Sequence, residues 1–341
     1  MLAAAMVLAF VVSAVATRFL WMHGCGSLRI IDHPNDRSLH RTPVPRTGGL
    51  GVLAGLTVAA VAAARGPVSE AWVWLSAAVA LVGVVSFLDD RSGVSPHWRL
   101  LAHLGAAGLL MAGGILWTVI DLPWGHWRLP LPVVLPLTLL CVVWMINLYN
   151  FMDGMDGFAG GMAVFGFGAL AVLGWQAGDL AYAAAAAIVA ASAGGFLTSN
   201  FPPARIFLGD AGSSTLGLLA AGLSLLGAQR GHFPLWAAGL AFSPFIVDAT
   251  WTLFRRLSRG ERLWEAHRTH HYQRLVLAGW GHRKTLLYSY VLMAASAATA
   301  VAGVHMPAAE QAWLLVAWAG IYVLVHVKVG QVERAAAAGG A

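Results

Sequence analysis

Residues 131–157 read LPVVLPLTLLCVVWMINLYNFMDGMDG. The part from 131 to 149 is almost entirely apolar and is long enough for an α-helix to cross the hydrocarbon core of a bilayer. Two asparagines, Asn147 and Asn150, and two Asp-Gly pairs follow closely. The stretch therefore predicts a membrane-spanning helix that ends in a polar turn at one membrane surface.

The rest of the chain repeats this pattern. Hydrophobic residues make up 59% of the 341 residues and charged residues 11%, whereas soluble domains carry roughly 25% charged residues. We expect an all-α, polytopic membrane helical bundle that forms one domain over 1–330, followed by a disordered, low-complexity tail at 331–341. Eleven passes are predicted, at 1–20, 48–64, 70–88, 99–118, 131–149, 158–176, 180–198, 212–228, 234–254, 285–304 and 308–327.

The positive charges predict the orientation. With eleven passes the two termini lie on opposite sides of the membrane. All but three of the 21 Lys and Arg residues then fall on or beside one face, and the other face holds Arg65, Arg128 and Arg230. This asymmetry predicts a cytoplasmic basic face, with the N-terminus outside and the C-terminus inside. The basic charge indicates topology and attraction of anions, so no nucleic acid is expected as a partner. The loops of the basic face are 21–47, 89–98, 150–157, 199–211 and 255–284.

Asp89 and Asp90 end the third predicted pass. Two adjacent carboxylates repel each other, and a divalent cation or a bound proton would relieve that repulsion. The alternative is a solvated helix end in which Arg91 neutralises one of the acids.

The segment after the fifth pass carries amides and acids together. Asn147 and Asn150 share one helix face, and Asp153 and Asp156 each precede a glycine. Oxygen-rich surroundings of this kind suit Mg²⁺, which shares its coordination with waters and substrate phosphates. The alternative is a pair of Asp-Gly turns that only join two helices.

The eighth pass begins with a candidate phosphate site. Asp210 is placed to cap this helix, and Gly212 and Ser213 expose backbone amides at its positive end. Helix N-termini near glycine bind phosphates. Capping alone is the other interpretation of Asp210.

Two basic loops complete the set of motifs. Segment 32–49 (DHPNDRSLHRTPVPRTGG) contains prolines that predict an extended, ordered crossing. Its Arg37, His40 and Arg46 could bind phosphates, or they could serve only as a positive-inside anchor. Segment 267–274 (HRTHHYQR) could bind a diphosphate, although a basic surface helix on anionic lipid is the alternative.

The two cysteines and the acid Asp248 lie outside these motifs. The two cysteines, Cys25 and Cys141, are expected to be free thiols, and structural zinc is not expected. Asp248 lies within the ninth predicted pass, where an acid is a functional candidate by default. A hydrogen bond between helices would explain it equally well.

Five motifs in this order resemble the polyprenyl-phosphate N-acetylhexosamine-1-phosphate transferase family, a glycosyltransferase family 4-like group related to the phospho-MurNAc-pentapeptide translocase. The resemblance covers about residues 30–290. The motifs are DHPNDRSLHRTPVPRTGG, FLDD, NLYNFMDGMDGFAG, FPPARIFLGDAGSSTLG and HRTHHYQRL.

The resemblance implies an enzyme of the bacterial inner membrane with a cytoplasmic active site. It implies transfer of N-acetylhexosamine-1-phosphate from a UDP-sugar, such as UDP-GlcNAc, to undecaprenyl phosphate with release of UMP. That step starts a lipid-linked cell-surface glycan. Mg²⁺ is the implied cofactor, with Mn²⁺ as a substitute.

The resemblance also implies roles by motif position. Asp89 and Asp90 match an aspartate pair near the lipid phosphate and the metal. The family's DGxDG acids and first motif histidine correspond to Asp153, Asp156 and His270, which with the aspartate pair form the catalytic candidates. The expected metal ligands are Asn150 and Asp210. The expected substrate-binding residues are Arg37, His40, Arg46, Asn147, Asn150, Gly212, Ser213, Arg268, His271 and Arg274.

Two departures from the family pattern stand out. Arg91 and Ser92 follow the aspartate pair where the family usually has a further acid, and the histidine motif lacks its trailing histidines. This form resembles the branch that initiates O-antigen or teichoic acid, and it leaves the donor sugar open.

Two other functions are compatible with the composition. A transporter or lipid-carrier flippase would use Asp248 inside the membrane. A CDP-alcohol phosphatidyltransferase also has Asp-Gly turns, but the sequence after Asp156 lacks the arginine and the further acids of that motif. A homodimer could form through small residues such as Gly160 and Gly161.

Overall fold

The structure is a computed structural model that describes residues 2–24, 30–34, 38–40, 42–64, 68–262 and 267–339. Arg37, a predicted phosphate contact, and Cys25, a predicted free thiol, lie outside these ranges. Cys141 is a free thiol, as expected.

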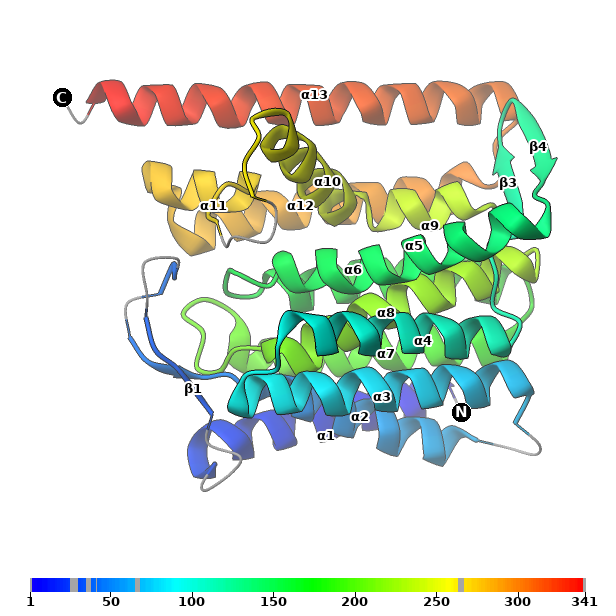
Figure 1. Cartoon of the computed structure of the whole chain (residues 1–341), viewed down its shortest axis with the longest axis horizontal. Coiled ribbons are helices and arrows are strands. Elements are labelled where there is room, and N and C mark those ends of the chain that lie inside the picture. Colours follow the sequence, from blue (N-terminus) through cyan, green and yellow to red (C-terminus); the bar gives the residue numbers. More distant parts are fainter. Residues whose placement is uncertain are drawn as a thin grey trace.

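Long helices run side by side along one axis (Figure 1). The first half contains α1 (Leu2–His23), α2 (Gly48–Ala63), α3 (Glu70–Ser92), α4 (Pro96–Ala112), α5 (Leu131–Phe151) and α6 (Phe158–Gln176). The second half contains α7 (Leu180–Asn200), α8 (Gly209–Gln229), α9 (Leu235–Ala241), α10 (Ser243–Ser258), α11 (His271–Leu275), a π-type segment η2 (Val276–Trp280), α12 (Gly281–Gly303) and α13 (Ala308–Gly339).

Two antiparallel pairs of short strands lie at opposite ends of the bundle (Figure 1). One pair joins β1 (Ile31–Asp32) to β2 (Val44–Pro45), and the other joins β3 (Val119–Leu122) to β4 (Gly125–Arg128). The first pair agrees with the extended crossing predicted for segment 32–49. The second pair was not predicted from the sequence.

The expected all-α membrane class is confirmed. Within the described ranges, eight helices are long and apolar enough to cross a membrane, or nine if α9 and α10 form one bent span. The count of eleven is therefore not shown, and neither is the orientation of the termini. The helix α2 has 16 residues and is about 24 Å long at 1.5 Å per residue, and α4 does not qualify as a candidate span.

The predicted ninth pass, 234–254, is broken. The axes of α9 and α10 meet at an angle of 81°. Pro244 occupies the first turn of α10, where its missing N–H is tolerated but where it prevents a continuous helix. The break turns α10 across the bundle and gives it one buried face, which carries Asp248, and one exposed face, which carries Trp251 and Phe254.

The helix α8 is the centre of the bundle and is buried along nearly its whole length. It lies against α3 and α5, and α2 meets its N-terminal end. The close approach to α2 depends on two glycines, because a Cβ on Gly49 would collide with the backbone of Gly212. The start of α8 is consequently fixed against the neighbouring helices.

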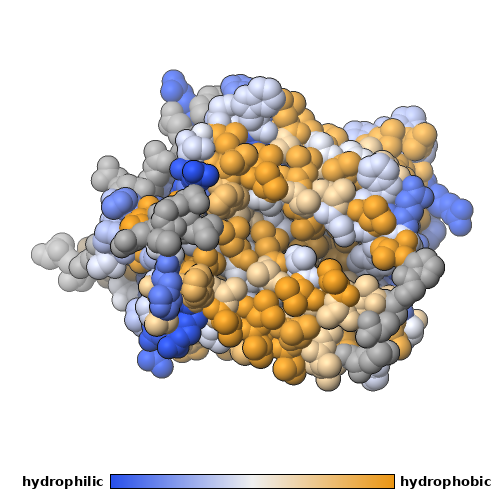
Figure 2. Space-filling model, turned by 90° about the horizontal axis from the view of Figure 1, so that it is seen from below, coloured by the Kyte–Doolittle hydropathy of each residue, from blue (hydrophilic) through white to orange (hydrophobic). Residues whose placement is uncertain are grey.

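One side of the molecule has hydrophobic residues across its middle and hydrophilic residues gathered towards its two ends (Figure 2). Exposed apolar side chains of the first helices include Val7, Val61 and Val84. This distribution is what a bilayer-embedded bundle requires.

The C-terminal tail differs from the expectation. Residues 331–341 were predicted to be disordered, but α13 continues as a helix to Gly339. The run of alanines after Arg334 explains this extension, because alanine has the highest intrinsic helix propensity.

Candidate active site

Asp90, at the end of α3, binds the start of α8. Its Oδ1 accepts a hydrogen bond from the backbone N–H of Asp210 at 3.1 Å, and its Oδ2 accepts one from Ala211 at 3.0 Å. These amides have no partner within the helix, and the positive end of the helix dipole favours a carboxylate at this place. Asp90 is 4% exposed and therefore anchors α8 to α3.

Asp89 is bound differently. Its Oδ1 accepts a hydrogen bond from the backbone N–H of Val94 at 2.6 Å, and its Oδ2 accepts one from Nη1 of Arg99 at 2.6 Å. The first contact fixes the turn between α3 and α4, and the second pairs the carboxylate with a cation on α4.

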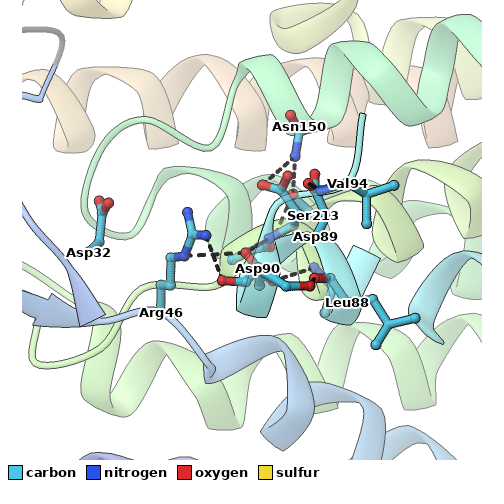
Figure 3. A network of polar contacts seen from close by, with 12 residues as sticks. Asp32, Arg46, Leu88, Asp89, Asp90, Val94, Asn150 and Ser213 are labelled. Atoms are coloured by element: carbon cyan, nitrogen blue, oxygen red, sulfur yellow. Dashed lines mark hydrogen bonds and ion pairs between the residues drawn. The ribbon is translucent and has the colours of Figure 1, made fainter. Parts of the chain in front are cut away.

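Asp210 contacts the polar network in which Figure 3 labels Asp89, Asp90, Asn150 and Ser213. Nδ2 of Asn150 donates to Asp210 Oδ1 at 2.9 Å and to Ser213 Oγ at 3.0 Å. Nη1 of Arg99 lies 3.6 Å from Asp210 Oδ2. The side chain of Asp210 remains 31% exposed, so it is a carboxylate that a ligand can reach.

Asp153 belongs to the turn between α5 and α6. Burial raises the pKa of its carboxyl group well above the usual range, and the nearby charges of Asp210, Asp90 and Asp32 raise it further. Acids from four separate segments of the chain therefore influence one another at this end of the bundle.

The acid cluster offers oxygen ligands to a metal ion. Within the described ranges, no three His, Cys, Asp or Glu side chains form a group that could hold a metal by themselves. Mg²⁺, however, is commonly bound by one or two carboxylates together with substrate phosphates. The repulsion felt by Asp153 and the exposed carboxylate of Asp210 suit a divalent cation that a phosphate ligand would help to hold.

Asp156, the second acid of the Asp-Gly turns, faces another set of partners. Its Oδ2 accepts a hydrogen bond from the backbone N–H of Ala204 at 3.0 Å, and its Oδ1 lies 3.1 Å from Nδ1 of His282. Nearby, Asn200 Oδ1 accepts a hydrogen bond from Gly157 N–H at 2.8 Å. Asp156 thus joins its own turn to the loop after α7 and to the start of α12.

Asp248 holds the histidine segment in place. Its Oδ1 lies 3.4 Å from Nδ1 of His270 and 3.0 Å from Nδ1 of His271, and it accepts the backbone N–H of His271 at 2.9 Å. Nε2 of His271 then lies 3.0 Å from Nδ1 of His326 on α13. The acid is fully engaged in joining α10, α11 and α13.

Tyr272 connects the histidine segment with the Asp-Gly turns. Its hydroxyl donates to the carbonyl of Phe151 at 3.3 Å, and its ring stacks on that of His270 with centroids 5.9 Å apart. A Cβ on Gly154 would collide with the tyrosine hydroxyl, so the glycine makes this contact possible. The ring of Tyr272 therefore lies between the buried His270 and the turn that carries Asp153.

Of the predicted phosphate contacts, Arg46 lies closest to the acid cluster. Its Nη2 donates to the carbonyl of Asp90 at 2.7 Å, and its Nε lies 3.5 Å from Asp90 Oδ1. Nε2 of His40 lies 3.6 Å from Asp32. Arg268 is exposed, whereas Arg274 forms an ion pair with Glu333 on α13.

Three other predicted substrate contacts bind or pack against neighbouring parts of the protein. Nδ2 of Asn147 donates to the carbonyl of Val143 at 2.7 Å and lies 3.3 Å from Nδ1 of His103. Gly212 provides the close approach of α8 to α2. Ser213 is fully buried beneath Asn150, and its hydroxyl also donates to Gly209.

Two residues beside the acid cluster, Arg99 and Asp32, are not among the predicted site residues. Arg99 was counted only as a positive charge near the membrane, yet it contacts Asp89 and approaches Asp210. Asp32 was noted only as part of a charged loop, yet it contributes to the field at Asp153. A basic residue in the first turn after a paired-acid motif was the available signal for Arg99.

Comparison with known proteins places the chain in a family. Residues 71–228 match Glycosyl transferase family 4. A probable undecaprenyl-phosphate N-acetylglucosaminyl 1-phosphate transferase of Bacillus subtilis is 31% identical over 265 residues, which are 77% of this chain and 74% of that protein. The chain belongs to glycosyl transferase family 4.

Two further relatives of this family 4 protein cover similar parts of the chain. A phospho-N-acetylmuramoyl-pentapeptide-transferase of Synechococcus is 33% identical over 292 residues, 78% of this chain and 81% of that protein. A decaprenyl-phosphate N-acetylglucosaminephosphotransferase of Mycobacterium tuberculosis is 30% identical over 295 residues, 77% of this chain and 73% of that protein. The resemblance predicted from the motifs is confirmed at the level of the family.

The matched region contains most of the acid cluster. It includes the ends of α3 and α5, the turn with Asp153 and the start of α8 with Asp210. The family 4 protein is thus a membrane-embedded transferase whose polar cluster lies where three helix ends meet.

Proposed function

We propose that this protein transfers N-acetylhexosamine-1-phosphate from a UDP-sugar to undecaprenyl phosphate and releases UMP. UDP-GlcNAc is the proposed donor, because the names of the Bacillus and Mycobacterium relatives specify N-acetylglucosaminyl transfer. The observation that carries the proposal is the cluster of Asp90, Asn150, Asp153 and Asp210 at one end of a membrane-spanning bundle.

The chemistry suits this cluster. A phosphate monoester has a second pKa near about 6, so a lipid phosphate is largely dianionic at neutral pH and needs no strong base for activation. The obstacle is the approach of two anions, and fixed positive groups are the main aid that a protein can give. Arg46 and Arg99 lie beside the acids and supply such groups.

We propose that Asp210 and Asn150 hold Mg²⁺ together with the diphosphate of the donor, with Mn²⁺ as a substitute. The metal would neutralise the charge of the phosphates. The Asn150 amide contacts Asp210 through Nδ2, and a 180° rotation of the amide brings its oxygen to the same place. Asp153 lies near these acids, and the cation would reduce the repulsion that contributes to its raised pKa.

The remaining acids have distinct proposed roles. Asp90 keeps the start of α8 in place, because both of its oxygens bind α8 backbone amides. Asp89 holds Arg99 towards Asp210 and orients the lipid phosphate through that cation. His270 supports the Asp-Gly turn through Tyr272.

We further propose that the acid-cluster end of the bundle is cytoplasmic, at the bacterial inner membrane. Eighteen of the 21 Lys and Arg residues fall on that face if α2 and α4 also count as passes, which gives the expected eleven. The alternative function, a flippase that uses Asp248 as an intramembrane acid, has less support, since that carboxylate is held by His270 and His271.

A donor panel tests the proposal. The purified full chain is mixed with Mg²⁺, undecaprenyl phosphate and UDP-GlcNAc, UDP-GalNAc or UDP-MurNAc-pentapeptide, and UMP release is measured. We expect UMP with UDP-GlcNAc and none without the lipid phosphate. UMP from the pentapeptide donor alone would reassign the sugar, and no UMP from any donor would refute the proposed reaction.

A further inference from the structure

A second candidate site lies at the opposite end of the bundle. A cavity of about 530 Å³ lies between the β3–β4 hairpin, the C-terminal end of α8 and the corner between α12 and α13. Figure 1 shows this hairpin at the far end from the connection between α3 and α4, where Asp89 and Asp90 lie. The volume is within the range of pockets that bind small molecules.

The hairpin presents one face to this cavity. Val119 pairs with Arg128 and Asp121 pairs with His126 in the antiparallel register. Side chains of directly paired residues lie on the same face, and alternate residues along each strand return to it. These four residues accordingly share one face, and all four line the cavity.

Among the described residues that line the cavity, Arg128 is the one Lys or Arg side chain. The Asp121 carboxylate on the same face is paired with His126, whose Nδ1 lies 3.3 Å from Asp121 Oδ1. Elsewhere on the wall, Nε2 of His305 is bound to Gln176 at 3.1 Å. The guanidinium of Arg128 forms no hydrogen bond or ion pair with the described part of the chain, and it is exposed.

The lining also contains apolar side chains, among them Trp117, Leu225, Phe233 and Val304. A free cation together with an apolar surface in one cavity suits an amphiphile with an anionic group. Neither feature alone would select such a molecule.

The position of the cavity matches the boundary of the membrane. The candidate spans α5, α8 and α12 all begin or end beside it. Two tryptophans of the hairpin, Trp124 and Trp127, are 61% and 48% exposed, and tryptophan is enriched at membrane–water interfaces. Lipid headgroups are therefore the amphiphiles available at this depth.

We propose that this cavity binds the headgroup of an anionic glycerophospholipid. The lipid phosphate pairs with Arg128, and the glycerol and the first acyl carbons contact Trp117, Leu225 and Val304. The site is separate from the acid cluster and does not depend on the proposed transferase reaction.

The test measures lipid binding to the delipidated full chain in detergent by native mass spectrometry, with phosphatidylglycerol as the probe. We expect one tightly bound lipid, and we expect Arg128→Gln to weaken binding about tenfold, or about 1.4 kcal/mol. The matched control is Arg91→Gln, an exposed arginine at the other end of the bundle, which should bind like the unmodified protein.

A second variant distinguishes binding in the cavity from a general effect of charge. Val304→Trp fills the apolar side while keeping Arg128, and it should also weaken binding. A Tm in detergent close to that of the unmodified protein shows that each variant is folded. Unchanged binding by both variants would overturn the site, and full competition by soluble glycerol phosphate at the lipid's own concentration would assign the cavity to a free phosphate ester.

Discussion

Asp90 Oδ1 accepts a hydrogen bond from the backbone N–H of Asp210 at 3.1 Å, between residues separated by 120 positions in the sequence. The contact fixes the end of α3 to the start of α8. It also places the side chain of Asp210 beside Asn150 and Arg99. One acid thus positions another, and the two make different contacts in the same cluster.

Replacement of Asp90 by asparagine should lower both stability and activity. The amide group of Asn keeps one acceptor and turns an N–H towards a backbone N–H of α8. We expect a loss of about 1–3 kcal/mol in the free energy of unfolding and a reduced kcat. Thermal unfolding in detergent, with Glu310→Gln on the exposed start of α13 as the control, measures the effect. An unchanged Tm for Asp90→Asn would contradict the anchoring role.

Arg99 should matter through its shape as well as its charge. Nη1 of Arg99 makes the contacts with both Asp89 and Asp210, and it lies further from the backbone than Nζ of a lysine, so the lysine ammonium should not reach the same place. We expect Arg99→Lys to lower kcat/KM for UMP release about tenfold, or about 1.4 kcal/mol, with little change in Tm. Arg91→Lys, eight residues earlier and exposed, is the matched control and should keep normal kinetics. Equal kinetics for the two variants would remove Arg99 from the site.

We expect the stability of the protein to depend on divalent cations through Asp153. Burial and the charges of Asp210, Asp90 and Asp32 raise its pKa, so its contribution to stability is present below its unfolded pKa of about 3.9 and is lost as pH rises through the folded value. Without Mg²⁺ at neutral pH, Asp153→Asn should therefore raise Tm.

The same variant should respond less to Mg²⁺. Adding Mg²⁺ should raise the Tm of the unmodified protein more than that of Asp153→Asn, because the cation relieves repulsion that the variant lacks. An equal rise in Tm for both proteins would show that Asp153 does not face the cation.

The sequence predicted the class of fold because apolar stretches of spanning length are a strong local signal. It also predicted that Asp90, Asn150 and Asp210 converge, since each follows or precedes a pass on the same face. It did not predict the break before Pro244, because the apolar pattern continues across it. For Asp248 the alternative of a hydrogen bond between helices agrees with the structure, but its partners His270 and His271 could not be predicted, since α10 meets α9 at an angle of 81°.

We expect stability to depend on pH through Asp179, at the end of the bundle opposite the acid cluster. Although burial opposes ionisation of Asp179, hydrogen bonds from Tyr182 N–H and Arg230 hold the pKa of this carboxyl group below its usual range. Its contribution is present above the unfolded pKa of about 3.9 and is lost as pH falls through the lower folded value. Asp179→Asn should thus lower Tm at pH 7.

The difference between Asp179→Asn and the unmodified protein should shrink as pH falls below the unfolded pKa of about 3.9 and through the lower folded value. Tm measured across this range checks the prediction. A gap that stays constant or widens with acidification would show that the ion pair with Arg230 is not its source.

We propose that Asp210 is the acid at which the donor diphosphate is bound for transfer. UMP release from UDP-GlcNAc and undecaprenyl phosphate by Asp210→Asn, compared with Glu310→Gln as a charge-matched control, tests it most directly. We expect Asp210→Asn to lose about 100-fold or more of kcat while its Tm stays within a few degrees of the unmodified protein. Full activity of a folded Asp210→Asn variant would contradict the account.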